Sequence, residues 1–138
     1  MNNKSRGYHN LVRAAKRAKL KAYAPYSMFR VGAAIKTKNG KVYTGCNIEN
    51  SSYGLTICAE RTAIFKAVSE GEKKFTAIAV ASDDLDFCPP CGACRQVLAD
   101  LAPNIDLVMI DKRGRERVVT LRALFPFPFG PDHLLKKK

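Results

Sequence analysis

TAIAVASDDLDFCPPCGACRQVLADL, residues 76–101, is the stretch that decides the fold class. Its first seven residues form a short, mostly apolar run, which is typical of a strand buried within a sheet. From Cys91 to Leu101 the apolar residues recur at helical spacing, and Pro103 follows, as expected where a helix ends. A buried strand followed by a helix predicts a crossover unit of an α/β sheet.

The residues before this stretch predict two helices and one hairpin. A helix is expected over residues 8–23, because proline disfavours a helical residue before it and Pro25 follows closely. Residues 30–36 and 41–45 flank an Asn-Gly pair, the strongest short hairpin signal. The segment CAERTAIFKAVSEG, residues 58–71, has apolar residues at helical spacing and a glycine at its end, which predicts a second helix.

After the stretch, residues 105–110 and 115–120 read as two more strands around a glycine turn, with a short helical turn at 121–124. The expected fold is therefore α/β, a three-layer α/β/α arrangement with a central mixed sheet of about five strands. We expect a single domain over residues 1–138 and a solvated tail at residues 136–138.

The composition indicates in which cellular compartment the protein is expected and which kinds of partner it is expected to bind. No run approaches the ~20 apolar residues of a membrane span, and the first ten residues lack the apolar core of a signal peptide. We therefore expect a soluble, cytoplasmic protein without a membrane partner. The net charge is +12, and the first 48 residues hold eleven Lys and Arg but no acid. Such an uneven distribution of positive charge is typical of proteins that bind nucleic acid.

The basic residues of the first helix favour a different interpretation. They fall opposite an apolar stripe made of Leu11, Ala15, Ala18 and Ala22. Such a pattern is typical of any amphipathic helix that turns its charged face to solvent. Nucleic acid is therefore not the expected partner.

Five cysteines in a cytosolic chain predict metal binding or catalysis, because thiols there are kept reduced. Cys58 opens one expected helix, and Cys91 and Cys94 open another in a Cys-x-x-Cys pair. Helix N-termini favour thiolates, and three protein ligands leave one tetrahedral position for water, as in catalytic zinc sites. Cys46 is interpreted as a small buried hydrophobe, and Cys88 receives no role.

Two residues beside Cys58 suit supporting roles at such a site. Glu60 lies too close along the helix to be an easy fourth ligand, yet near enough to serve as a general acid and base. Arg61 could donate a hydrogen bond to a thiolate sulfur from outside the ligand set. On spacing alone, Arg61 reads equally well as an exposed helix residue.

The cysteine segments carry a family resemblance. Cys58-Ala59-Glu60, followed by Pro90-Cys91-Gly92-Ala93-Cys94, is similar to the zinc signature of the cytidine deaminase superfamily. Residues 29–34 (FRVGAA), 45–50 (GCNIEN) and 91–97 (CGACRQV) resemble the small, homotetrameric, three-cysteine cytidine deaminases of free nucleosides. The likeness extends over nearly the whole chain.

The resemblance implies a cytidine deaminase-like fold and one Zn²⁺ per subunit. The implied reaction is hydrolysis of cytidine and deoxycytidine to uridine and deoxyuridine plus ammonia, in pyrimidine salvage, with Glu60 moving the protons. It further implies a homotetramer whose sites are completed by neighbouring subunits.

The same resemblance assigns substrate contacts. It implies that Asn47 and Glu49 bind the ribose hydroxyls and that Phe29 packs against the base. It also implies that the backbone at Ala59 reads the pyrimidine edge and that Phe129 of a neighbouring subunit covers the base, a role that Phe125 or Phe127 could also fill.

Two other functions stay open at this point. The basic N-terminal third is compatible with a deaminase of polynucleotides, although 138 residues leave little room for the aromatic stacking platforms that such enzymes need. Alternatively, Cys88, Cys91 and Cys94, with Cys58 elsewhere, could hold an iron–sulfur cluster in a non-catalytic module. The bacterial ferredoxin spacing requires a further cysteine followed by proline, and neither follows here.

Overall fold

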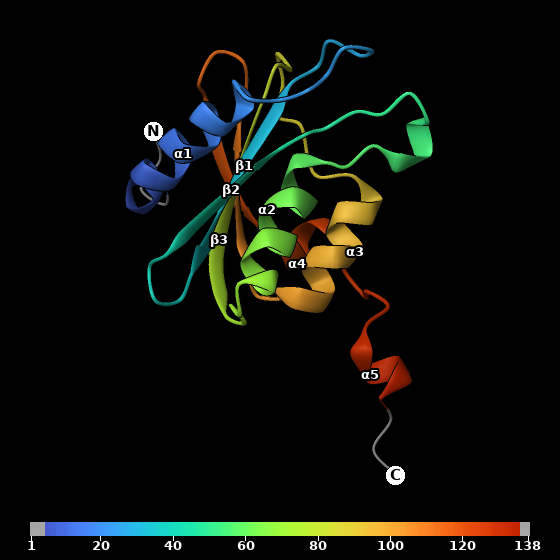
Figure 1. Cartoon of the computed structure of the whole chain (residues 1–138). Helices are drawn as coiled ribbons and strands as arrows, with labels where there is room; N and C mark the ends of the chain where they lie inside the picture. The colour runs from blue at the N-terminus through green and yellow to red at the C-terminus, as the bar shows by residue number, and fades with distance from the viewer. Residues whose placement is uncertain (1–4, 136–138) are drawn as a thin grey trace.

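A five-stranded mixed sheet forms the centre of the computed structural model, which describes residues 5–135 (Figure 1). The strands lie in the order β2-β1-β3-β4-β5, and they are β1 Val31–Thr37, β2 Val42–Cys46, β3 Phe75–Ser82, β4 Asp106–Ile110 and β5 Glu116–Thr120. Only β3 and β4 pair in parallel, and the other neighbouring strands are antiparallel. The predicted crossover unit is therefore confirmed, since β3 and β4 are joined through a helix.

Helices cover both faces of this sheet (Figure 1). They are α1 His9–Lys19, α2 Ala59–Ser69, α3 Gly92–Leu101, α4 Leu121–Leu124 and α5 Pro131–Leu134, with 3-10 turns at η1 Ser5–Tyr8 and η2 Tyr53–Leu55. One buried cluster lies between α1 and the sheet, and the other joins α2 and α3 to the opposite face. Both faces of β3 are thus buried, which explains its apolar run. The predicted three-layer α/β/α fold is confirmed.

The first helix is shorter than predicted and ends at Lys19. The next residues form a turn, and Tyr23 then makes an isolated bridge with Ile48. Its backbone donates to the Asn47 carbonyl and accepts from the Glu49 amide. Tyr23 must be extended to make these long-range bonds, so the helix ends before it. None of the described helices is long and apolar enough to cross a membrane.

The C-terminal end of the chain holds a helix that the sequence did not predict. Helix α5 has only four residues, and His133 Nδ1 accepts a hydrogen bond from the Gly130 amide at its start. A single turn of helix carries no apolar periodicity that a sequence could show. The predicted tail at residues 136–138 lies outside the described residues.

Two glycines set how closely the helices approach the sheet. A Cβ at Gly32 would lie 2.2 Å from the Lys19 nitrogen of α1. A Cβ at Gly45 would lie 2.5 Å from the Ala63 nitrogen and 2.6 Å from the Ala59 carbonyl oxygen, both in α2. The backbones of β2 and α2 therefore meet without an intervening side chain. This contact fixes the depth of the start of α2, where Glu60 lies in the first turn and Cys58 directly precedes the helix.

We predict that Gly45→Ala destabilises the protein by roughly 1–3 kcal/mol, because the added methyl forces α2 away from the sheet. Urea unfolding followed by circular dichroism measures this change. Gly54→Ala is the matched control, since nothing lies within 4 Å of its added Cβ. Equal unfolding midpoints for the two variants would show that the close approach of α2 is not required.

Candidate metal centre and active site

Three cysteine sulfurs converge where α2 and α3 begin. Cys58 directly precedes α2, Cys91 directly precedes α3, and Cys94 lies in the first turn of α3. The three Sγ atoms lie within 4.8 Å of one another, and those of Cys58 and Cys91 are 3.9 Å apart. Zinc bonded to thiolates at ~2.3 Å in a tetrahedron places its sulfurs ~3.8 Å apart. The donor set and its spacing therefore fit a zinc ion with one ligand position left over.

Local backbone geometry explains why the sulfurs meet. Cys58 and Cys91 both have the extended conformation of residues that cap a helix start, with φ and ψ of −77° and 154° and of −64° and 168°. Pro89 and Pro90 keep the chain extended before Cys91, because proline fixes its own φ and disfavours the helical region for the residue before it. Cys94 follows one helical turn later, so its sulfur returns to the same side as that of Cys91.

The cluster stabilises negative charge even without a metal. The nearby Cys94 thiol and the Arg61 guanidinium lower the pKa of Cys58. The nearby Cys58 sulfur and burial raise the pKa of Cys94. Metal binding must therefore displace the Cys94 proton, as zinc does at thiol ligands.

Arg61 supplies positive charge at this cluster. Its Nη2 donates to the Cys58 sulfur at 3.4 Å, and this bond raises the pKa of the guanidinium. Its Nε is buried and has no hydrogen-bond partner among residues 5–135. A buried donor beside three thiols fits a cluster that gains negative charge when all three ionise. The Arg61 side chain thus contacts a sulfur of the cluster.

Glu60 is a buried carboxyl next to the cysteines. Only 5% of the residue is exposed, and it lies in the first turn of α2. Burial raises the pKa of Glu60 to about 7, and the charge of Cys58 adds to this effect. A carboxyl in such surroundings exchanges a proton close to neutral pH, which is what general acid and base chemistry requires.

Asn47 and Glu49 organise the loop that carries Phe29. Asn47 Oδ1 accepts from the Val31 amide at 2.9 Å, and its Nδ2 donates to the Phe29 carbonyl at 2.8 Å. Glu49 Oε1 accepts from the Ser27 amide at 3.1 Å, and its Oε2 accepts from the Ser27 hydroxyl. The bonds that Glu49 accepts, chiefly the one from the Ser27 hydroxyl, lower the pKa of its carboxyl.

Ser27 is a residue of this loop that sequence reasoning missed. Its hydroxyl joins Glu49 to the Phe29 amide, which donates to Ser27 Oγ at 3.0 Å. Met28, which lies between Ser27 and Phe29 in the chain, has a φ of +58°, a conformation that is rare for residues other than glycine. No local sequence pattern marks such a link, because the two ends lie 22 residues apart in the chain.

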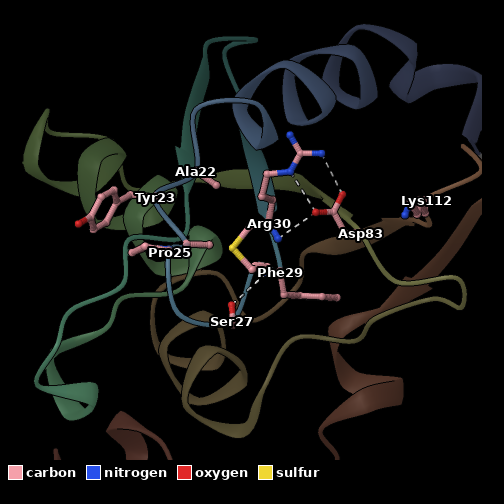
Figure 2. Close-up of a pocket in the computed structure, with 10 residues that line it drawn as sticks. Ala22, Tyr23, Pro25, Ser27, Phe29, Arg30, Asp83 and Lys112 are labelled. Atoms are coloured by element: carbon pink, nitrogen blue, oxygen red, sulfur yellow. Dashed lines mark hydrogen bonds and ion pairs between the residues drawn. The ribbon is translucent and has the colours of Figure 1, made fainter.

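Phe29 also borders the cavity drawn in Figure 2, which has a volume of about 740 Å³. Asp83 faces Arg30 there and accepts from its Nε at 3.0 Å, while Lys19 Nζ lies 2.9 Å from Asp83. None of the three clustered cysteines lines this cavity. Phe29 is therefore the only predicted site residue among those lining it.

The remaining predicted residues divide between the cysteine cluster and the C-terminal segment. Ala59 is the first residue of α2, and its side chain is fully buried. Phe129 is 56% exposed, and its ring stacks on His133 at a centroid distance of 5.1 Å. The groove that it lines includes Phe65 and Leu134 but none of the cysteines.

The other two candidate phenylalanines have different surroundings. Phe125 is half-buried against the core below α2 and α3, whereas Phe127 is fully exposed. Cys88, which an iron–sulfur cluster would need, is not among the three clustered sulfurs. Its own sulfur points to the Pro89 carbonyl at 3.8 Å. The geometry thus favours a three-thiol site over a four-thiol cluster.

Comparison with known proteins agrees with this geometry. Residues 5–110 match the family model described as the cytidine and deoxycytidylate deaminase zinc-binding region. A cytidine deaminase of Halalkalibacterium halodurans is 51% identical over 125 residues, which cover 90% of this chain and 95% of that protein. A Dictyostelium discoideum protein named "Probable cytidine deaminase" is 63% identical over 127 residues, covering 91% and 86% of the two chains.

A solved structure extends the likeness to three dimensions. The crystal structure of cytidine deaminase from Burkholderia pseudomallei superposes with a TM-score of 0.85 and 48% sequence identity. The superposition covers 94% of this chain and 100% of that chain. Sequence, fold and the three-thiol cluster agree, and the chain belongs to the cytidine and deoxycytidylate deaminase family.

Proposed function

We propose that this protein catalyses zinc-dependent hydrolytic deamination of cytidine and deoxycytidine, which yields uridine or deoxyuridine and ammonia. The observation that carries the proposal is the cluster of Cys58, Cys91 and Cys94 with the buried Glu60 carboxyl beside it. Relatives that match over nine tenths of the chain, from Halalkalibacterium halodurans and Burkholderia pseudomallei, carry the name cytidine deaminase. Recovery of pyrimidine nucleosides for reuse is the general role of such an enzyme.

The proposed ligands of the zinc ion are the sulfurs of Cys58, Cys91 and Cys94. When bound, zinc supplies Lewis acidity that lowers the pKa of water to near neutrality. Two helix N-termini and the Arg61 guanidinium offset the negative charge of the thiolates. We expect the Arg61 bond to Cys58 to persist when the metal is bound, because an ionised sulfur is the better acceptor.

Glu60 is the proposed proton carrier. As water adds to C4 of the cytosine ring, the Glu60 carboxylate accepts its proton and passes it to ring N3. A second proton passes from the hydroxyl now on C4 through the same carboxyl to the exocyclic amine, the C4–N bond breaks as the C4 carbonyl forms, and ammonia leaves. Burial of Glu60 suits both transfers, since a carboxyl with a pKa near neutrality can accept and donate.

Asn47 and Glu49 are the proposed contacts for the ribose hydroxyls. An amide nitrogen carries two N–H donors, and a carboxylate offers about four acceptor sites. The bonds to the loop around Phe29 use only part of that capacity. The same two side chains would then hold the Phe29 loop against the base and bind the sugar, while the backbone at Ala59 reads the pyrimidine edge.

We also propose a homotetramer in which Phe129 covers the base in a neighbouring site. Within one chain Phe129 lines a groove apart from the cysteines, so it serves that site only across a subunit contact. Large apolar side chains are exposed along the loops before α2, namely Tyr26, Met28, Ile48, Tyr53 and Leu55. Apolar surface of this kind marks protein interfaces. A single domain and a cytoplasmic location complete the proposal.

We predict that Glu60→Gln lowers kcat for cytidine by about 10³-fold while the protein keeps its zinc. The amide matches the carboxyl in shape but cannot accept and return a proton, and general acid and base catalysis contributes about 10²–10⁴-fold. Ultraviolet-monitored deamination gives kcat, and atomic absorption on the same samples gives the zinc content.

Two variants control this measurement. Glu70→Gln changes an exposed carboxyl just beyond the end of α2 and is expected to leave kcat unchanged. Cys91→Ala is expected to lose both zinc and activity. Full activity of Glu60→Gln with zinc bound would refute the proton-transfer role, and an inactive wild type full of zinc would refute the nucleoside substrate.

We predict that mixing two impaired variants restores activity if Phe129 acts in a neighbouring subunit. Phe129→Ala subunits retain Glu60, and Glu60→Gln subunits retain Phe129, so a mixed oligomer contains some complete sites. The two variants are co-expressed with different tags, isolated as mixed oligomers, and assayed at low cytidine concentration. Activity above the sum of the parents is expected, and activity equal to that sum would place Phe129 in its own chain's site. Native mass spectrometry reports whether the oligomer is a tetramer.

A further inference from the structure

Arg95 makes two hydrogen bonds to backbone carbonyls from the first turn of α3. Its Nε donates to the Pro90 carbonyl at 2.8 Å, and its Nη1 donates to the Leu124 carbonyl at 2.9 Å. The residue directly follows Cys94 and is half-buried. The site described above gives it no role.

The first of these bonds acts on the segment that carries a proposed metal ligand. Pro90 is fully buried and directly precedes Cys91. The backbone ladder of α3 begins one residue later, where the Arg95 amide donates to the Cys91 carbonyl. The Pro90 carbonyl is thus outside the helix, and a buried carbonyl without a donor destabilises the folded chain. Arg95 supplies that donor and fixes the peptide bond that leads into Cys91.

The second bond reaches the segment that carries the phenylalanines. Leu124 is the last residue of α4, and the last carbonyls of a helix have no partner within the helix. It also begins the sequence LFPFPFG, residues 124–130. At the other end of this segment, Gln96 Nε2 donates to the Phe129 carbonyl at 2.8 Å. Neighbouring residues of α3 therefore hold both ends of the aromatic segment.

We propose that Arg95 is a positioning residue that holds Cys91 in place for the metal and joins the metal-ligand loop to the aromatic segment. This inference rests on the proposed ligand role of Cys91. It does not require any particular substrate, because the Pro90 carbonyl and the Cys91 sulfur belong to the metal site itself. The two ends of one guanidinium thus connect the parts of the protein proposed to hold the metal and to cover the base.

The chemistry of arginine suits this bridge. A guanidinium offers five N–H donors in a planar fork, so one side chain can serve two carbonyls in different directions. Lysine ends in a single nitrogen on a flexible stem and lacks the separate Nε and Nη1 donors that the planar fork holds toward the two carbonyls. Arg95→Lys therefore keeps the charge and most of the apolar stem but breaks the bridge, whereas Arg95→Gln removes the charge as well.

The test measures metal retention in the zinc-loaded, full-length protein. Release of zinc to a chromophoric chelator is followed well below the unfolding temperature. We expect Arg95→Lys and Arg95→Gln to release zinc about tenfold faster than wild type, the lower end of the effect of mutating partners outside the ligand set. In cobalt-substituted samples, the thiolate-to-metal absorption band is expected to shift in the same variants.

Gln96→Ala is the matched control for metal release, because Gln96 also bonds the aromatic segment but not the Pro90 carbonyl. Its release rate is expected to stay within twofold of wild type. Arg122→Ala, which removes an exposed arginine whose guanidinium donates to the Asn104 side chain, controls for loss of charge.

An unchanged release rate and an unchanged cobalt spectrum in Arg95→Lys overturn the proposal, even if its melting temperature falls. If Arg95→Gln does not fold, Arg95→Lys alone decides. These readouts are independent of deamination. A failure of the Glu60→Gln prediction would therefore leave the metal-release result interpretable, and the two proposals can fail separately.

Discussion

The need to hold three thiolates close together beneath the protein surface constrains the rest of this structure. Three sulfurs around one divalent cation leave an excess negative charge, which is costly to place in a partly buried site. The chain offsets it with the N-termini of α2 and α3 and with Arg61. Helices α2 and α3 must therefore begin close to each other, and the connections between the sheet and these helices place their first residues beside the cysteines. The β3-α3-β4 crossover places the start of α3, and the contact at Gly45 sets the depth of α2.

Burial of Glu60 follows from the same arrangement. A carboxyl in the first turn of α2 is carried beneath the surface because α2 lies directly on β2. The pKa of Glu60 rises because burial removes water from its carboxyl. The charged groups beside it are the Cys58 sulfur and the Arg61 guanidinium. The layered fold thus produces two different environments within three residues. At Cys58 the negative charge is stabilised, and at Glu60 the proton is retained.

The sequence predicted those parts of the structure that depend on local chemistry. Cys58 and the Cys91-Cys94 pair were identifiable because ligand spacing and helix starts are properties of short segments. The end of α1 was misplaced because Tyr23 pairs with Ile48, 25 positions away along the chain, and no local propensity encodes this. Ser27 and Arg95 were missed for a related reason. Each bonds groups distant in sequence, through Glu49 and through the Leu124 carbonyl, so only the folded chain reveals the contact.

The large positive charge of the chain has little direct influence on the thiolates. Screening in physiological salt acts over about 8 Å, and helix α1 packs on the face of the sheet opposite to α2 and α3 (Figure 1). Arg61 donates to Cys58 from 3.4 Å, well inside that length. Some of the basic residues are also paired, since Asp83 bonds Lys19 and Arg30. The chemistry of the site is therefore set by a few charges in contact with the sulfurs, and the surplus on α1 belongs to its solvent-facing surface.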